Sequence, residues 1–157
     1  MSHEARLARL GLTLPTAPAP IAKFAPAITH GELVYTSGHG PVSADGSYVV
    51  GKLGATFDVE QGRAAARLTG LGLLATLRAH LGSLDRITRI VKVLGMVNAT
   101  PDFTDHPKVI DGFTGLMLDV FGDAGMSARS AVGMMSLPGG IAVEIELIAS
   151  ISADHRR

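Results

Sequence analysis

One arginine and two glutamates stand in otherwise apolar, strand-like sequence near the C-terminal end of the chain. Arg129 is followed by the uncharged run SAVGMM, and Glu144 and Glu146 alternate with apolar residues in a strand predicted over 141–151. An unpaired guanidinium is costly to bury, so Arg129 is either solvated at a strand end or bound to an anion. Its planar fork matches a carboxylate. The two glutamates either face water or belong to a site.

The predicted distance between Arg129 and Glu144 limits what they do together. Residues 129–135 and 141–151 are expected to form a hairpin about the SLPGG loop. Glu144 would then lie opposite Val132, and Arg129 would lie three residues further along, roughly 10 Å away at about 3.3 Å per residue. That is too far for a direct ion pair. We expect the gap to hold a small ligand, or the two residues to face each other across a subunit boundary.

Two amphipathic helices are predicted in the middle of the chain. The first begins after Asp58, which has a capping-box pattern with Gln61, and ends at Gly82. The second has Pro107 in its first turn and ends at Gly122.

Strand patterns flank these helices, at 33–37, at 48–50 after an Asp45-Gly46 turn, at 87–97, and in the C-terminal hairpin. The order β-meander, helix, strand, helix, hairpin predicts an α+β fold with both helices on one face of a mixed sheet. Residues 87–97 are apolar on both faces of their strand, so we expect another copy of the chain to cover the face that the helices leave open.

Size and composition narrow the class of protein. With 157 residues, 46% of them hydrophobic, the chain is interpreted as a single domain over 1–157, with residues 1–26 as a proline-rich N-terminal arm. Basic and acidic residues number 14 each, so no basic footprint favours nucleic acid. There is no cysteine, and no apolar run reaches the roughly 18 residues of a membrane span. We expect a cytoplasmic protein with neither nucleic acid nor membrane as a partner.

Two motifs together resemble the RidA/YjgF family. They are VYTSGHGP at 34–41 and ARSAVGMMSLPGGIAVEIELIA at 128–149. The resemblance implies a chorismate-mutase-like α+β fold with a mixed six-stranded sheet, two helices on one face, and a homotrimer with ligand pockets between subunits. It also implies hydrolysis of reactive enamine/imine intermediates, of the 2-aminoacrylate and 2-iminopropionate type, to 2-keto acids and ammonia. No metal and no organic cofactor is implied.

The resemblance also assigns roles to residues of this chain. Arg129 would hold the carboxylate of a small-molecule substrate, and Glu144 would hold and deprotonate the water that attacks the imine carbon. Gly38 would offer backbone contacts, with Ser37 beside it in the pocket.

Four further pocket positions depart from common family residues. Phe24 stands where many members have tyrosine, and His39 where glutamine is frequent. Ala131 replaces a frequent cysteine, and Asp111 falls where a pocket asparagine is expected. An inward-pointing Asp111 would repel a carboxylate substrate, so these departures predict an altered substrate preference.

Other functions fit the same residues. A non-catalytic binder of small carboxylates or keto acids would use the same arginine, whereas a ribonuclease is disfavoured by the neutral charge. His39 would either orient a ligand or cap its turn. The six histidines show no metal-ligand spacing, so we expect no metal site; they are His3, His30, His39, His80, His106 and His155.

Overall fold

A computed structural model describes residues 1–153; His155, considered above, lies outside this part. Its sheet has five strands in the order β1-β2-β5-β3-β4, and all neighbours are antiparallel except the parallel pair β3 and β4. The strands are β1 (Ala27–His30), β2 (Leu33–Thr36), β3 (Ile87–Asn98), β4 (Ala128–Met134) and β5 (Val143–Ile151). The fold is therefore α+β with a mixed sheet, as predicted.

The expected sixth strand does not form within the described residues. Residues 48–50 make isolated bridges, Val42 to Tyr48 and Val50 to Ile141, and join no continuous ladder. Their partner segment is interrupted by Gly139 and Gly140, whose positive φ values of 63° and 71° turn the chain out of the extended conformation. The β-meander predicted over 33–37 and 48–50 is therefore wrong. Strand β2 pairs instead with β1, which the sequence pattern did not predict, and residues 48–50 belong to an irregular loop.

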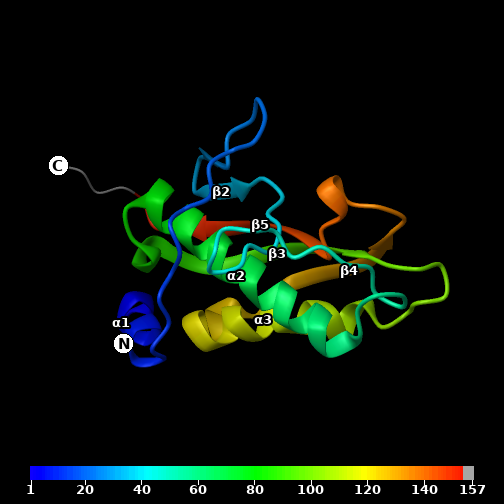
Figure 1. The fold of residues 1–157 in the computed structure, drawn as a ribbon. Helices are drawn as coiled ribbons and strands as arrows, with labels where there is room; N and C mark the ends of the chain where they lie inside the picture. The colour runs from blue at the N-terminus through cyan, green and yellow to red at the C-terminus, as the bar shows by residue number, and fades with distance from the viewer. Residues whose placement is uncertain (154–157) are drawn as a thin grey trace.

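The two predicted helices are confirmed, and they lie together on one face of the sheet (Figure 1). Helix α2 (Val59–Leu81) begins at Asp58, whose side chain accepts from the Gln61 amide while the Gln61 side chain accepts from the Asp58 amide. Helix α3 (His106–Phe121) has proline in its first turn and ends at Gly122. The core between helices and sheet contains Leu73, Leu77, Ile90, Ile110, Phe113, Leu116, Met117 and Ile145.

Strand β3 lies between β5 and β4 and decides which side chains share a face. A register shift between Ile90 and Lys92 breaks the strict alternation, so Ile90 and Val93 are both buried while Val91 is exposed. Both side chains therefore face the core, although strict alternation along residues 87–97 would put Ile90 and Val93 on opposite faces. Beyond the shift the alternation is regular, and Leu94 and Met96 lie on the face without helices.

The predicted C-terminal hairpin is wrong. Strand β3 is inserted between β4 and β5, running parallel to β4 and antiparallel to β5. Arg129 pairs with Val93, whereas Glu144 pairs with Met96. The SLPGG segment, which contains the turn η3 (Pro138–Gly140), therefore crosses the end of β3 instead of closing a two-stranded ribbon.

The N-terminal segment is fixed to the body of the protein at both ends. Helix α1 (His3–Arg9) is held by Glu4, whose carboxylate accepts from Arg78 at 2.6 and 3.1 Å and from the Leu84 amide at 3.0 Å. Residues 10–26 then run without helix or strand to β1 (Figure 1). The turns η1 (Leu84–Arg86) and η2 (Gly122–Gly125) complete the secondary structure of the described residues.

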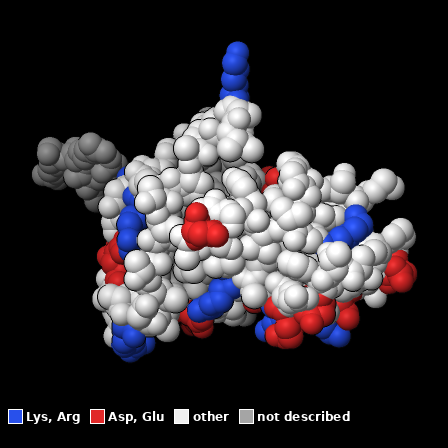
Figure 2. All heavy atoms as spheres, in the orientation of Figure 1, with Lys and Arg blue, Asp and Glu red and all other residues white. Residues whose placement is uncertain are grey.

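Charged side chains are interspersed on the face shown in Figure 2, where blue and red groups lie among large white areas. Across residues 1–153, no helix combines the length and the apolar character that crossing a membrane would need.

Candidate functional site

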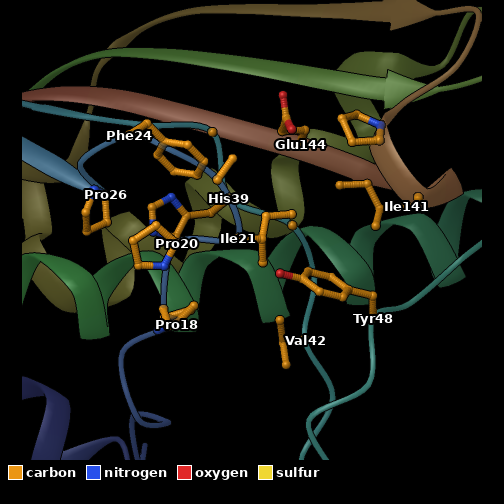
Figure 3. A pocket seen from close by; sticks show the side chains of 16 residues that line it. Pro18, Pro20, Ile21, Phe24, Pro26, His39, Val42, Tyr48, Ile141 and Glu144 are labelled. Atoms are coloured by element: carbon orange, nitrogen blue, oxygen red, sulfur yellow. The ribbon is translucent and has the colours of Figure 1, made fainter.

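A cavity of about 400 Å³ lies between the proline-rich N-terminal segment and the start of β5 (Figure 3). Four residues that the sequence assigned to a site line it: Phe24, Gly38, His39 and Glu144. Because Glu144 stands on the helix-free face of β5, its carboxyl group reaches the wall of this cavity. The cavity therefore brings together Glu144, the expected general base, and three residues that are expected to contact a ligand.

Glu144 is held against the backbone of the loop after β2. A Cβ atom placed on Gly38 would lie 2.8 Å from Glu144 Cδ and 2.9 Å from Oε2, so a side chain at Gly38 would displace this carboxyl group. Burial raises the pKa of Glu144, and the nearby Glu146 carboxylate raises it further. A half-buried carboxylate with a raised pKa is a stronger proton acceptor once ionised, which suits a general base.

His39 fixes the turn that follows β2. Its Nδ1–H donates to the Ser37 carbonyl oxygen at 2.8 Å, and its Nε2 accepts from the Thr76 hydroxyl of α2, also at 2.8 Å. Burial lowers the pKa of His39, against a smaller opposing effect of the Ser37 hydrogen bond, and favours the neutral ring. Since both nitrogens are engaged by the protein, these contacts match the turn-capping interpretation rather than ligand orientation.

Ser37 holds the N-terminal segment and does not line the cavity. Its hydroxyl donates to the Ala25 carbonyl oxygen at 2.6 Å, and its amide donates to the Pro26 carbonyl oxygen at 2.9 Å. These two bonds fix the segment that carries Phe24. Ser37 thus acts on the cavity through the backbone of residues 24–26.

Arg129 lies in a second, smaller cavity of about 280 Å³ beside α3. Its Nη1 donates to Asp111 Oδ1 at 2.8 Å and to Thr114 Oγ1 at 3.2 Å, while its side chain is 22% exposed. Of the two alternatives for Arg129, a solvated strand end or a bound anion, the structure shows a bound anion, and this anion is Asp111 of the same chain. Both of these bonds use Nη1, so the rest of the fork is available to a second anion.

The two cavities share no lining residue, and the side chains of Arg129 and Glu144 point to opposite faces of the sheet. Arg129 pairs with buried Val93 and points toward α3, whereas Glu144 pairs with Met96 on the helix-free face. Three residues along the strands and two strand spacings put their Cα atoms about 14 Å apart. One copy of the chain therefore does not bring Arg129 and Glu144 to a common ligand.

Ala131 lies outside both cavities. It pairs with Gly95 of β3, on the same face as Arg129, and packs half-buried against the core.

The sequence did not identify Ile21, Tyr48, Thr76 or Thr114 as neighbours of a site. For Thr114 a signal existed, because residues three apart share a helix face and Asp111 had been singled out.

No three histidine or acidic side chains gather closely enough to hold a metal ion among residues 1–153. His106, near the start of α3, lies instead against Phe103, with ring centroids 5.4 Å apart.

Residues 4–149 match the family model described as "YjgF/chorismate_mutase-like, putative endoribonuclease". The chain belongs to the YjgF family. A curated relative, "Protein TCP17" of Trypanosoma cruzi, is 40% identical over 149 residues, or 94% of this chain and 93% of that protein. The YjgF assignment confirms the family resemblance of the two sequence motifs.

Solved structures of similar proteins share the fold. A "putative endoribonuclease" from Shewanella oneidensis is 33% identical with a TM-score of 0.91, covering 96% of this chain and all (100%) of that one. E. coli TdcF, described with bound serine, is 25% identical with a TM-score of 0.62, covering 87% of this chain and 94% of that one.

Proposed function

We propose that this YjgF-family protein hydrolyses reactive enamine/imine intermediates, of the 2-aminoacrylate and 2-iminopropionate type, to 2-keto acids and ammonia. Arg129 of one copy holds the substrate carboxylate, and Glu144 of a second copy is the general base. The observation that carries this proposal is the position of Glu144: a half-buried carboxylate with a raised pKa at the wall of a ligand-sized cavity.

Arg129 and Glu144 lie on opposite faces of the sheet, and this supports a site built from two copies of the chain. The helix-free face of the sheet carries apolar side chains next to Glu144 and Glu146; they include Leu94, Met96, Val132 and Ile148. Such a face is stabilised when another copy covers it. In a homotrimer each interface joins two different surfaces, so the Glu144 cavity of one copy meets the edge strand β4 of the next.

The reaction needs a bound acid, a water molecule and one proton acceptor. Arg129 fixes the imine by its carboxylate, which places the imine carbon near the water held by Glu144. The water oxygen forms a bond to that carbon, the C=N π pair moves to nitrogen, and Glu144 takes the proton released from water. Glu144 then returns the proton to nitrogen, which gives a carbinolamine. Glu144 next takes the hydroxyl proton of this intermediate and passes it to the amine nitrogen, so that the C=O bond of the keto acid forms as ammonia leaves with the C–N bonding pair. General base catalysis of this kind contributes about 10²–10⁴-fold.

The serine bound to TdcF supports a small amino-acid-like ligand in this family. Serine carries the same α-carboxylate next to a nitrogen-bearing carbon as a 2-imino acid does, and an arginine fork suits that carboxylate.

The proposal is tested by generating 2-aminoacrylate or 2-iminobutyrate in situ with a dehydratase and measuring the rate of keto-acid release. The intact protein should accelerate release, and Arg129→Ala should remove most of the acceleration. Arg67→Ala is the matched control, because Arg67 also pairs with an aspartate, Asp119 at 3.3 Å, but lines neither cavity. No acceleration by the intact protein would contradict the proposal.

A non-catalytic binder of small carboxylates or keto acids is the second candidate, favoured by the Arg129–Asp111 pair, which shows that the guanidinium already holds a carboxylate. Glu144→Gln separates the two functions. An enzyme should lose turnover and keep affinity for pyruvate, whereas a binder shows no turnover before or after the change.

A further inference from the structure

The cavity beside Glu144 is larger than a three-carbon imine requires. It encloses about 400 Å³. At roughly 30 Å³ per non-hydrogen atom, the volume that a water molecule takes in the liquid, 2-iminopropionate fills less than half of that space. The remaining volume would hold water against apolar walls, or a larger substituent of the substrate.

The walls of the cavity are mainly apolar, as Figure 3 shows. Ile21 and Phe24 come from the N-terminal segment, Val42 and Tyr48 from the loop after β2, and Ile141 from the approach to β5. These side chains lie around one space with the Glu144 carboxyl group at its edge. Apolar surface of this extent recognises hydrocarbon, because it offers burial and few hydrogen bonds.

The polar residues of the lining do not change that character. His39 has both ring nitrogens bonded to Ser37 and Thr76, so it presents carbon atoms to the cavity. Glu144 has the role of general base in the proposed reaction. Apart from the Tyr48 hydroxyl, no other side chain in the lining carries a polar atom.

The cavity is pre-formed because the N-terminal segment that covers it is anchored at both ends. Glu4 holds α1 through Arg78, and Ser37 holds Ala25 and Pro26 through a side-chain and a backbone hydrogen bond. Proline residues between these anchors restrict φ, so the N-terminal segment loses less conformational entropy when it is held in one conformation over the cavity. A ligand side chain therefore enters space that already exists.

We propose that this cavity receives an apolar side chain of isobutyl to benzyl size, so that the preferred substrates are 2-imino acids with branched-aliphatic or aromatic substituents. The inference rests on the proposed function, in which Glu144 activates water at the imine carbon. Each methylene buried against these walls favours binding by about fourfold. A 2-imino acid with an isobutyl group should therefore be preferred to 2-iminopropionate by at least about tenfold in kcat/KM.

Imines of graded size test this directly. D-amino acid oxidase with catalase produces them from D-alanine, D-leucine and D-phenylalanine, and semicarbazide traps the imine that escapes hydrolysis. In the wild type, kcat/KM should rise with side-chain size. Val42→Phe, which fills the cavity, should lower kcat/KM by about tenfold or more for the two larger imines and by a clearly smaller factor for the alanine-derived imine. Circular dichroism and thermal unfolding show whether the variant is folded.

Val59→Phe is the matched control, because Val59 opens α2 and lies outside both cavities. It should leave the preference unchanged. Equal or faster turnover of the alanine-derived imine by the wild type would overturn the inference, as would an equal loss for all three imines in Val42→Phe. A change in oligomeric state with unchanged selectivity would assign the cavity to a neighbouring copy and would also overturn it.

A binding measurement separates this inference from the proposed function. Calorimetry with 4-methyl-2-oxopentanoate, phenylpyruvate and pyruvate measures the affinity of the cavity for each side chain, whether or not any imine is hydrolysed. Tighter binding of the two larger acids, lost in Val42→Phe, supports the assignment of the cavity to an apolar side chain even if the enzyme assay fails and the proposed function is rejected. Pyruvate binding as tightly as the larger acids would contradict the inference on its own.

Discussion

Arg129 and Glu144 lie on opposite faces of one sheet, with β3 between their strands. Each stands in its own cavity, and Arg129 is already paired with Asp111 at 2.8 Å. A site that uses both residues must therefore be completed by a second copy of the chain. A carboxylate ligand that binds the rest of the guanidinium also meets the negative charge of Asp111 beside it.

Asp111→Asn should strengthen the binding of carboxylate ligands. Removing the negative charge frees Arg129, and because Asp111 is 49% exposed the gain is modest, about two- to fivefold in the Kd of pyruvate. Calorimetry at low ionic strength measures it. Asp119→Asn, which removes the partner of Arg67, is the control and should leave the Kd unchanged. A weaker Kd in Asp111→Asn would show that Asp111 supports the ligand instead of competing with it.

Glu146→Gln should shift the acid limb of the pH profile of kcat/KM to lower pH. Burial is the larger cause of the raised pKa of Glu144, and the Glu146 charge is the second cause, which this variant removes. Glu144 must be ionised to accept a proton, so activity falls as pH drops through its pKa. The midpoint should move down by a few tenths of a pH unit, while Glu32→Gln, at an exposed turn, should leave it in place. An unmoved midpoint in Glu146→Gln would contradict Glu144 as the titrating base.

His39 should make the fold less stable below neutral pH. Burial lowers the pKa of His39 from 6.5, so between the two pKa values the unfolded chain binds more protons than the folded one. Its contribution to stability is therefore present above about pH 6.5 and is lost as pH falls through the lowered pKa. Urea unfolding between pH 7.5 and 5 should show a smaller pH dependence in His39→Gln than in wild type. His30→Gln, at an exposed position, should keep the wild-type dependence.

Gly112→Ala should destabilise the protein, because a Cβ at Gly112 would overlap the backbone carbonyl oxygen of Arg63 in α2. Backbone cannot rotate away as a side chain can, so we expect a loss of about 3 kcal/mol in the free energy of unfolding. Gly115→Ala is a matched control in the same helix, with nothing within 4 Å of the added carbon. It should gain up to about 1 kcal/mol. Thermal unfolding of both variants measures the difference, and equal Tm values would contradict the close contact between α2 and α3 at Gly112.

Features that depend on neighbouring residues in the chain were predictable from the sequence. The Asp58–Gln61 capping box and the glycine at the end of α3 act within one helical turn, and both helices were confirmed. The face of β5 that carries Glu144 follows from strict alternation, which the burial of β5 confirms.

Features that depend on distant partners were not predictable. The short SLPGG connection favours a hairpin locally, but hydrogen bonds to β3 on both sides separate β4 from β5. That parallel pairing with β3 turns Arg129 toward Asp111, which lies 18 residues away in sequence. The apolar cavity needs Ile21, Tyr48 and Ile141 from three separate segments, and no local pattern links them.

Complementation between two inactive variants tests the central claim most directly. Arg129→Ala and Glu144→Gln are unfolded together, mixed in equal amounts and refolded, and imine hydrolysis is then measured. If each site takes Arg129 from one copy and Glu144 from another, random trimers should recover about a quarter of the wild-type activity, because a quarter of the sites receive both intact residues. Activity no higher than that of the two variants assayed separately would contradict a site shared between copies.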